Sequence, residues 1–376
     1  MSSERADPAE RAERADPAGQ AGALARAHRH LRVRRRRSLL WHWARSLWVA
    51  PRPAQLEPLP AVGPGQLAVT FAGQATALLR YAGVGVVVDP MLGRWLGGVR
   101  RAVEPGLAPA DLQDVGLILI SHRHPDHLHL PTLARLPRTA TVVVPSGVAQ
   151  LVSPLGFARV VELAVGADLE LGGVGVIASP LSHGDDPSAR GLAYLVRGDG
   201  PSVFVYPDGA YFSGFADVGA RYAPDLALLP IGGYWPRSFR DRHMSPLDAL
   251  QAFADLRARV LVPIHHGTFA TSYELLDEPM RWMRELIAER GLADHACLLR
   301  PGQSELFAAA RVLRAGFDDG LAEAGAGDDD LATDAAEASA AGAEHGRAAD
   351  TSWADLPVGP GSGPVAGASP AAPGPS

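Results

Sequence analysis

The sequence predicts an α/β domain, with sheets covered by helices, between two tails that lack a hydrophobic pattern. Three observations support this fold class. Short apolar runs alternate with longer amphipathic stretches from Gly65 to about Phe307, as in sheets covered by helices. Hydrophobic residues make up 47% of the 376 residues and charged residues 20%, so the chain can bury a core. Because no apolar run approaches the roughly 18 residues of a membrane span, we do not expect an integral membrane protein.

The predicted strands are apolar or alternating runs bounded by turn signals such as Gly73 and Gly83. The run at 115–120 contains no polar side chain, which favours a strand buried on both faces. In chain order, we expect strands at residues 67–71, 77–81, 84–88, 115–120, 141–144, 175–178, 192–196, 202–206, 226–229 and 260–263.

Helices are predicted between these strands, where apolar residues recur with helical spacing. The clearest start signal combines Ser245 at the N-cap, Pro246 in the first turn and Asp248 three residues after the cap. We expect helices at residues 129–136, 147–152, 213–222, 245–257 and 278–290.

The two ends of the chain differ from the middle in charge. Residues 1–52 contain twelve arginines and five acidic residues, whereas residues 317–376 contain eleven acidic residues and one arginine. We expect four parts: a disordered arm at 1–25, a basic, tryptophan-rich lead-in segment at 26–64, one folded domain at 65–310, and an acidic, Ala/Gly/Pro-rich disordered tail at 317–376.

The lead-in segment contains a run without acidic residues between Arg32 and Trp48. This run is either an interfacial helix, with arginines at anionic headgroups and tryptophans at the membrane boundary, or a short helix whose tryptophans pack on the domain. Because His42 and Arg45 interrupt the apolar stretch, it does not resemble a signal peptide. We expect a cytoplasmic location, with peripheral membrane contact through Arg32 to Trp48 if the first interpretation holds.

The most informative segment places His122, His124, Asp126 and His127 directly after the predicted strand at 115–120. Ligands of α/β folds bind at such strand ends. In an extended stretch, residues two apart project to one side, so we expect His122 and His124 to share an ion and Asp126 to continue that side. His127 points elsewhere and, with Asp126, can reach a second ion. Imidazole nitrogens and carboxylate oxygens are typical ligands of zinc and similar divalent metals.

This His-x-His-x-Asp-His pattern resembles the metallo-β-lactamase superfamily, whose fold is a four-layer αβ/βα sandwich with a two-metal site between the sheets. The resemblance implies further ligands from a lone histidine, a bridging aspartate and a late histidine, each after a strand. His183, Asp208 and His265 follow predicted strands in that order. The implied ligands are His122, His124 and His183 for one ion and Asp126, His127 and His265 for the other, with Asp208 bridging both.

Within the superfamily, residues 65–285 resemble the N-acyl-phosphatidylethanolamine-hydrolysing phospholipase D group. The similar blocks are VTFAGQAT at 69–76, GGYWPR at 232–237, HMSP at 243–246 and IHHGTF at 264–269. One position departs from this group, which usually carries histidine where this chain has Gln74. Glutamine can form hydrogen bonds near the site but cannot shuttle a proton at neutral pH.

The resemblance implies a dinuclear metal-dependent hydrolase that cleaves a phosphodiester of the N-acyl-phosphatidylethanolamine type with a metal-bound hydroxide. A lactonase or another small-ester hydrolase on the same metal site is the alternative. The expected cofactors are two divalent metal ions. Zn²⁺ is the expected metal, and Mn²⁺ and Fe²⁺ are the alternatives. The expected substrate is a phospholipid or a small phosphorylated molecule, and we expect no nucleic-acid partner. The sequence does not indicate the oligomeric state.

Asp126 and His243 are the catalytic candidates. The resemblance places His243 at the mouth of the site, where it could protonate a leaving group, although it could also be an ordinary loop residue before a helix. Asp89 either accepts a hydrogen bond from a ligand imidazole or simply forms an Asp-Pro turn at a strand end. We expect structural roles for His266 and for Cys297, the single cysteine, which also excludes a disulfide framework.

Overall fold

The structure, a computed structural model, describes residues 40, 43–44, 48–184 and 191–308. The predicted arm at 1–25, the acidic tail at 317–376 and most of the Arg32 to Trp48 run lie outside the described residues. Of that run, Trp48 is exposed, and the Trp43 indole N–H donates a hydrogen bond to the Gly98 carbonyl, 3.0 Å away. Within the described ranges, no helix combines the length and apolar character needed to cross a bilayer.

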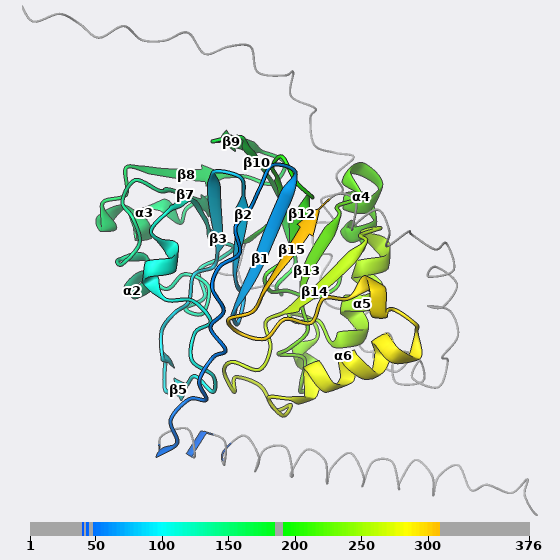
Figure 1. Cartoon of the computed structure of the whole chain (residues 1–376). Helices are drawn as coiled ribbons and strands as arrows, with labels where there is room; N and C mark the ends of the chain where they lie inside the picture. The colour runs from blue at the N-terminus through cyan, green and yellow to red at the C-terminus, as the bar shows by residue number, and fades with distance from the viewer. Residues whose placement is uncertain (1–39, 41–42, 45–47, 185–190, 309–376) are drawn as a thin grey trace, which may run out of the picture. The chain divides into compact units, whose positions relative to one another are not determined.

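The first of two large sheets has seven strands (Figure 1). The strand pairs at one edge are antiparallel and those at the other edge are parallel. Strands β3, β6, β7 and β8 run parallel, whereas β15, β1, β2 and β3 pair antiparallel. Its spatial order is β15 (Ser304–Ala308), β1 (Gln66–Gly73), β2 (Thr76–Tyr81), β3 (Val84–Val88), β6 (Val115–Leu119), β7 (Thr141–Pro145) and β8 (Arg159–Leu163).

The second large sheet has six strands, of which β12, β13 and β14 run parallel and the others antiparallel. A separate hairpin joins β4 (Trp95–Leu96) to β5 (Val99–Arg100). The order in the second sheet is β14 (Val260–Ile264), β13 (Leu226–Pro230), β12 (Val203–Val205), β11 (Gly191–Arg197), β10 (Val174–Leu181) and β9 (Asp168–Leu171).

The main core lies between the two sheets, because alternate residues of each strand point to the same face. Val69 and Leu79 from the first sheet belong to one buried cluster with Val176 and Tyr194 from the second. The opposite face of the first sheet packs in a separate cluster against the chain around α2 (Leu130–Leu133) and α3 (Ala149–Val152).

Longer helices cover the outer face of the second sheet: α4 (Gly214–Tyr222), α5 (Pro246–Asp255) and α6 (Glu278–Glu289). Phe215 of α4 lies against Phe204 and Tyr206, with ring centroids 6.4 and 4.8 Å apart. Helices therefore flank both sheets, which confirms the predicted four-layer αβ/βα sandwich (Figure 1). Short 3₁₀ turns occur at η2 (Pro109–Leu112), η3 (Ser153–Leu155), η5 (Arg237–Phe239) and η6 (Ala293–His295).

Two groups of elements differ from the prediction. Strands β8, β9 and β15 have no counterpart among the predicted elements, and each lies at a sheet edge. Their charged residues, such as Arg159 and Glu170, weaken the apolar pattern that identifies a strand. The helices predicted at 129–136 and 147–152 are single turns, α2 and α3, and Pro137 follows the first.

Candidate metal centre

The loops that follow β6, β10, β12 and β14 bring the seven predicted ligand residues together. Each loop leaves its strand at the same end of the sandwich, so side chains far apart in sequence meet there. The ligand-type atoms form two groups, and within each group these atoms lie within 4.8 Å of one another. The groups are His122, His124, His183 and Asp208, and Asp126, His127 and His265.

The segment after β6 does not continue as an extended strand. The backbone N–H groups of His127 and Leu128 donate to the His124 carbonyl at 3.0 and 2.8 Å, so the chain turns at Pro125. The expectation that Asp126 stays on the side of His122 and His124 is therefore wrong. The turn moves Asp126 into the second group, beside His127.

The spacing in the first group fits a bound cation. His124 Nδ1 lies 2.9 Å from His122 Nε2 and 3.2 Å from His183 Nε2. Asp208 Oδ2 lies 3.5 Å from His183 Nε2. Atoms that bind a tetrahedral zinc ion at about 2.0–2.1 Å are separated from one another by roughly 3.3 Å. The observed separations scatter around that value.

The hydrogen bonds of the first group also fix which ring nitrogens carry protons. Ser121 Oγ donates its one proton to Asp89 Oδ2 at 2.5 Å, so at 2.9 Å it must accept from His122 Nδ1. His183 Nδ1 faces the Arg242 carbonyl at 2.7 Å and must also donate. Burial lowers the pKa of both histidines, which keeps them neutral. Their Nε2 lone pairs therefore point into the group, as metal ligands require.

The second group contains a buried nitrogen that needs a partner. His127 Nδ1 lies 2.7 Å from Asp89 Oδ2, while His127 Nε2 is buried and has no hydrogen-bond partner among the described residues. His127 Nε2 and His265 Nε2 lie 3.5 and 3.6 Å from Asp126 Oδ2. Burial acts to lower the pKa of His127, but Asp126 and Asp89 outweigh it and raise that pKa. The carboxylates thus favour positive charge here, which a proton on His127 or a bound cation would supply.

Asp208 faces both groups with one carboxylate oxygen. Its Oδ2 atom lies 3.5 Å from His183 Nε2, 3.7 Å from His127 Nε2 and 3.6 Å from His265 Nε2. Burial acts to raise the pKa of Asp208, but the histidines around it, His243 first, hold that pKa well below its usual range. An ionised carboxylate oxygen at these distances is available as a ligand for a cation held by either group.

Asp89 combines the two roles that the sequence left open. It follows β3 in the left-handed region, with φ of +41°, so the chain bends at the strand end. Its side chain is fully buried and accepts hydrogen bonds from the Ser121 N–H at 2.7 Å, from the Ser121 hydroxyl and from His127 Nδ1. Asp89 therefore orients the imidazole of His127 and, through Ser121, that of His122.

His243 contacts the centre of the site. Its Nδ1 lies 2.8 Å from Asp208 Oδ1, and its ring centroid lies 4.9 Å from that of His183. The side chain is 19% exposed, so His243 lines the open side of the group. The capping box that begins α5, in which Ser245 and Asp248 exchange hydrogen bonds as the sequence predicts, fixes the loop that carries His243.

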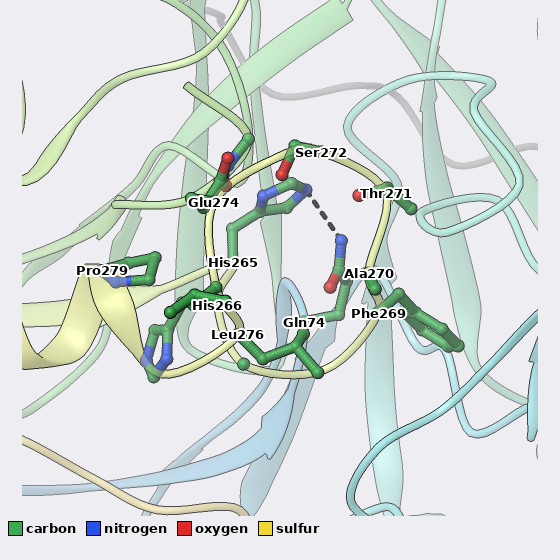
Figure 2. Close-up of a pocket in the computed structure, with 13 residues that line it drawn as sticks. Gln74, His265, His266, Phe269, Ala270, Thr271, Ser272, Glu274, Leu276 and Pro279 are labelled. Atoms are coloured by element: carbon green, nitrogen blue, oxygen red, sulfur yellow. Dashed lines mark hydrogen bonds between the residues drawn. The ribbon is translucent and has the colours of Figure 1, made fainter. Parts of the chain in front are cut away.

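His266 and Cys297 lie away from both groups. The His266 ring stacks on Phe71 with centroids 5.5 Å apart, and Figure 2 shows the side chains of His265 and His266 extending in different directions. Cys297 packs against the core between the sheets.

Two residues that orient ligands, Ser121 and Arg242, were not predicted from the sequence. Ser121 directly precedes His122 and could have been noticed as a neighbour. Arg242 acts through its backbone carbonyl, for which the sequence carries no signal.

Comparison with known proteins places this site in a family. Residues 85–266 match the family model described as the beta-lactamase superfamily domain. A metal-dependent hydrolase (UPF0173) of Thermofilum pendens is 30% identical over 58% of this chain and 86% of its own length. The chain belongs to the metallo-β-lactamase superfamily. It is a metal-dependent hydrolase, and the clustered histidines and aspartates are its candidate metal-binding residues.

Two further relatives show how far the likeness extends. The mitochondrial N-acyl-phosphatidylethanolamine-hydrolysing phospholipase D of Saccharomyces cerevisiae is 28% identical over 63% of this chain, which spans 55% of that enzyme. An isothiocyanate hydrolase from Delia radicum gut bacteria has 19% identity and a TM-score of 0.55, over 64% of this chain and 99% of that one. The second likeness concerns the fold alone.

Proposed function

We propose that this hydrolase binds two divalent ions and cleaves a phosphodiester in the manner of a phospholipase D. One observation carries the two-ion arrangement: Asp208 Oδ2 lies 3.5–3.7 Å from ring nitrogens of both ligand groups. A single ion would leave one group of inward-facing lone pairs without a partner. Zinc suits these nitrogen and oxygen ligands, and Mn²⁺ and Fe²⁺ are the alternatives.

Divalent ions in such a pair lower the pKa of water and neutralise charge that develops on a phosphoryl group. The chain itself orients the ligand imidazoles and supplies a proton for the leaving group. Asp89, Ser121 and the Arg242 carbonyl hold ligand imidazoles in the orientation described above. Burial acts to lower the pKa of His243, but Asp208 outweighs it and raises that pKa. His243 therefore retains a proton that it can donate to the departing alcohol oxygen.

The choice of a phosphodiester is supported by the yeast relative and by two exposed arginines that neighbour site histidines in the sequence. Arg123 lies between His122 and His124, and Arg242 precedes His243; both arginines are exposed. Guanidinium groups attract the phosphate of a lipid headgroup more strongly than they attract a neutral lactone.

The test supplies the purified, Zn²⁺-loaded protein with N-acyl-phosphatidylethanolamine and, separately, with a phosphosugar lactone. We expect N-acylethanolamine release from the lipid, with turnover of the lactone at least about tenfold slower. Turnover of the lactone alone would refute the phospholipase assignment.

Two variants test the metal site in that assay, one at a proposed ligand and one as a control. Asp208→Ala should lose activity and bound metal together, because the proposed bridging carboxylate is removed. His266→Ala should retain its metal, because its ring faces Phe71 and not the ligand groups.

A further inference from the structure

Gln74 occupies the turn between β1 and β2 and is held firmly beside His265. Its backbone has a φ of +55°, a conformation that non-glycine residues adopt at a cost and that is enriched at functional sites. The Gln74 N–H donates to Thr268 Oγ1 at 2.7 Å, and the His265 N–H donates to the Gln74 carbonyl at 2.7 Å. The residue is only 3% exposed.

The side-chain amide of Gln74 reaches the second ligand group (Figure 2). Its terminal atom, assigned as Nε2, lies 2.9 Å from Asp126 Oδ2 and 2.9 Å from His265 Nε2. These separations match those between the ligand atoms of the first group, where His124 Nδ1 and His122 Nε2 are also 2.9 Å apart. The amide is thus placed as a further ligand would be.

The chemistry decides which amide atom belongs at that position when a cation is bound. A cation on His265 Nε2 uses the lone pair that would accept an N–H from Gln74. The amide N–H would then point at positive charge, whereas the amide oxygen in the same place would be attracted. The oxygen and nitrogen of a glutamine exchange positions by a rotation of the terminal amide.

We propose that Gln74 is a ligand of the ion bound by Asp126, His127 and His265, through its side-chain oxygen. This inference rests on the two-ion arrangement proposed above. The glutamine then contributes a neutral oxygen from the β1–β2 turn, and its inability to shuttle a proton is no disadvantage in this role.

Three variants separate an oxygen ligand from an N–H donor. Gln74→Met removes both polar atoms, Gln74→Glu supplies oxygen only, and Gln150→Glu is a matched control at an exposed position. Metal-free proteins are titrated with Co²⁺, and the stoichiometry and visible absorption are recorded. Circular dichroism and the unfolding midpoint of the metal-free proteins show whether each variant folds.

We expect the wild type and Gln150→Glu to bind two equivalents with the same affinity. Gln74→Met should bind the second equivalent at least about tenfold more weakly, and Gln74→Glu should bind it as tightly as the wild type or more tightly. Equal weakening in both Gln74 variants would overturn the proposal in favour of an N–H donor to Asp126. Unchanged binding by Gln74→Met would also overturn it, while leaving the two-ion function intact. A wild type that binds only one equivalent would contradict both proposals.

Discussion

The position of one proton on each imidazole decides whether these histidines can bind metal. His122, His127 and His183 each direct Nδ1 to an acceptor outside the ligand groups, namely Ser121, Asp89 and the Arg242 carbonyl. Each ring consequently presents its Nε2 lone pair to the centre. Such supporting hydrogen bonds commonly change metal affinity by about 10–100-fold.

Replacing Asp89 with asparagine tests this dependence. Asparagine tolerates the positive φ of this position and can still accept from the Ser121 N–H. Its NH₂ group would then face His127 Nδ1, which moves the imidazole proton to Nε2 and removes the lone pair from the second group. We expect metal affinity there to fall about 10–100-fold in a competition titration with a chromophoric chelator.

The control for that titration is Asp111→Asn, because this exposed carboxylate accepts a hydrogen bond from the Ala108 N–H and belongs to neither ligand group. It should leave metal affinity unchanged. An Asp89→Asn variant with the affinity of the wild type would show that Asp89 does not govern the tautomer.

The sequence predicted the ligand candidates because metal chemistry restricts them to a few residue types at strand ends. The resemblance placed Asp126 with His127 and His265, but the extended-chain argument put it on the side of His122 and His124, although Pro125 is favoured at the second position of a turn and offered a local signal. The hydrogen bond from His183 to the Arg242 carbonyl could not be predicted. Every residue has a backbone carbonyl, and only the tertiary structure determines which one lies beside His183.

Among the secondary-structure elements, central strands carry a local sequence signal, whereas edge strands depend on tertiary pairing. Strands β3, β6 and β13 are apolar throughout, so their pattern identifies them, and the start of α5 follows from its capping residues. Strands β9 and β15 depend on pairing with β10 and β1, the second across the whole domain. Pairing between distant segments leaves little trace in local composition.

The contact between α4 and α5 depends on a glycine. A Cβ atom added at Gly219 of α4 would lie 2.1 Å from the Asp255 carbonyl oxygen and 2.8 Å from the Leu256 carbonyl carbon. These are backbone atoms, so the two helices would have to separate. We expect Gly219→Ala to lower the free energy of unfolding by about 1–3 kcal/mol in urea denaturation.

Gly175→Ala on β10 is the matched control, because its added Cβ would meet no heavy atom within 4 Å. It should change the free energy of unfolding by less than about 0.5 kcal/mol. Equal effects of the two substitutions would mean that helix contact is not what Gly219 provides.

Taken over the whole domain, the two ligand groups join the two sheets. His122, His124, Asp126 and His127 follow β6 of the first sheet, whereas His183, Asp208 and His265 follow β10, β12 and β14 of the second. Each group takes residues from both sheets. Any ion bound there links the sheets at one end of the sandwich, so metal binding and folding should be coupled.

This coupling predicts that the metal stabilises the fold and that acid removes the effect. With free metal at 100 times its dissociation constant, one site adds about 2.7 kcal/mol to the free energy of unfolding. Imidazoles must lose their protons to bind, so the gain should be smaller at pH 5 than at pH 7.5. Thermal unfolding with Zn²⁺ or with a chelator at pH 7.5 and pH 5 measures it. Asp208→Ala should show a much smaller chelator effect at pH 7.5, and a wild-type shift that is equal at both pH values would contradict histidine ligation.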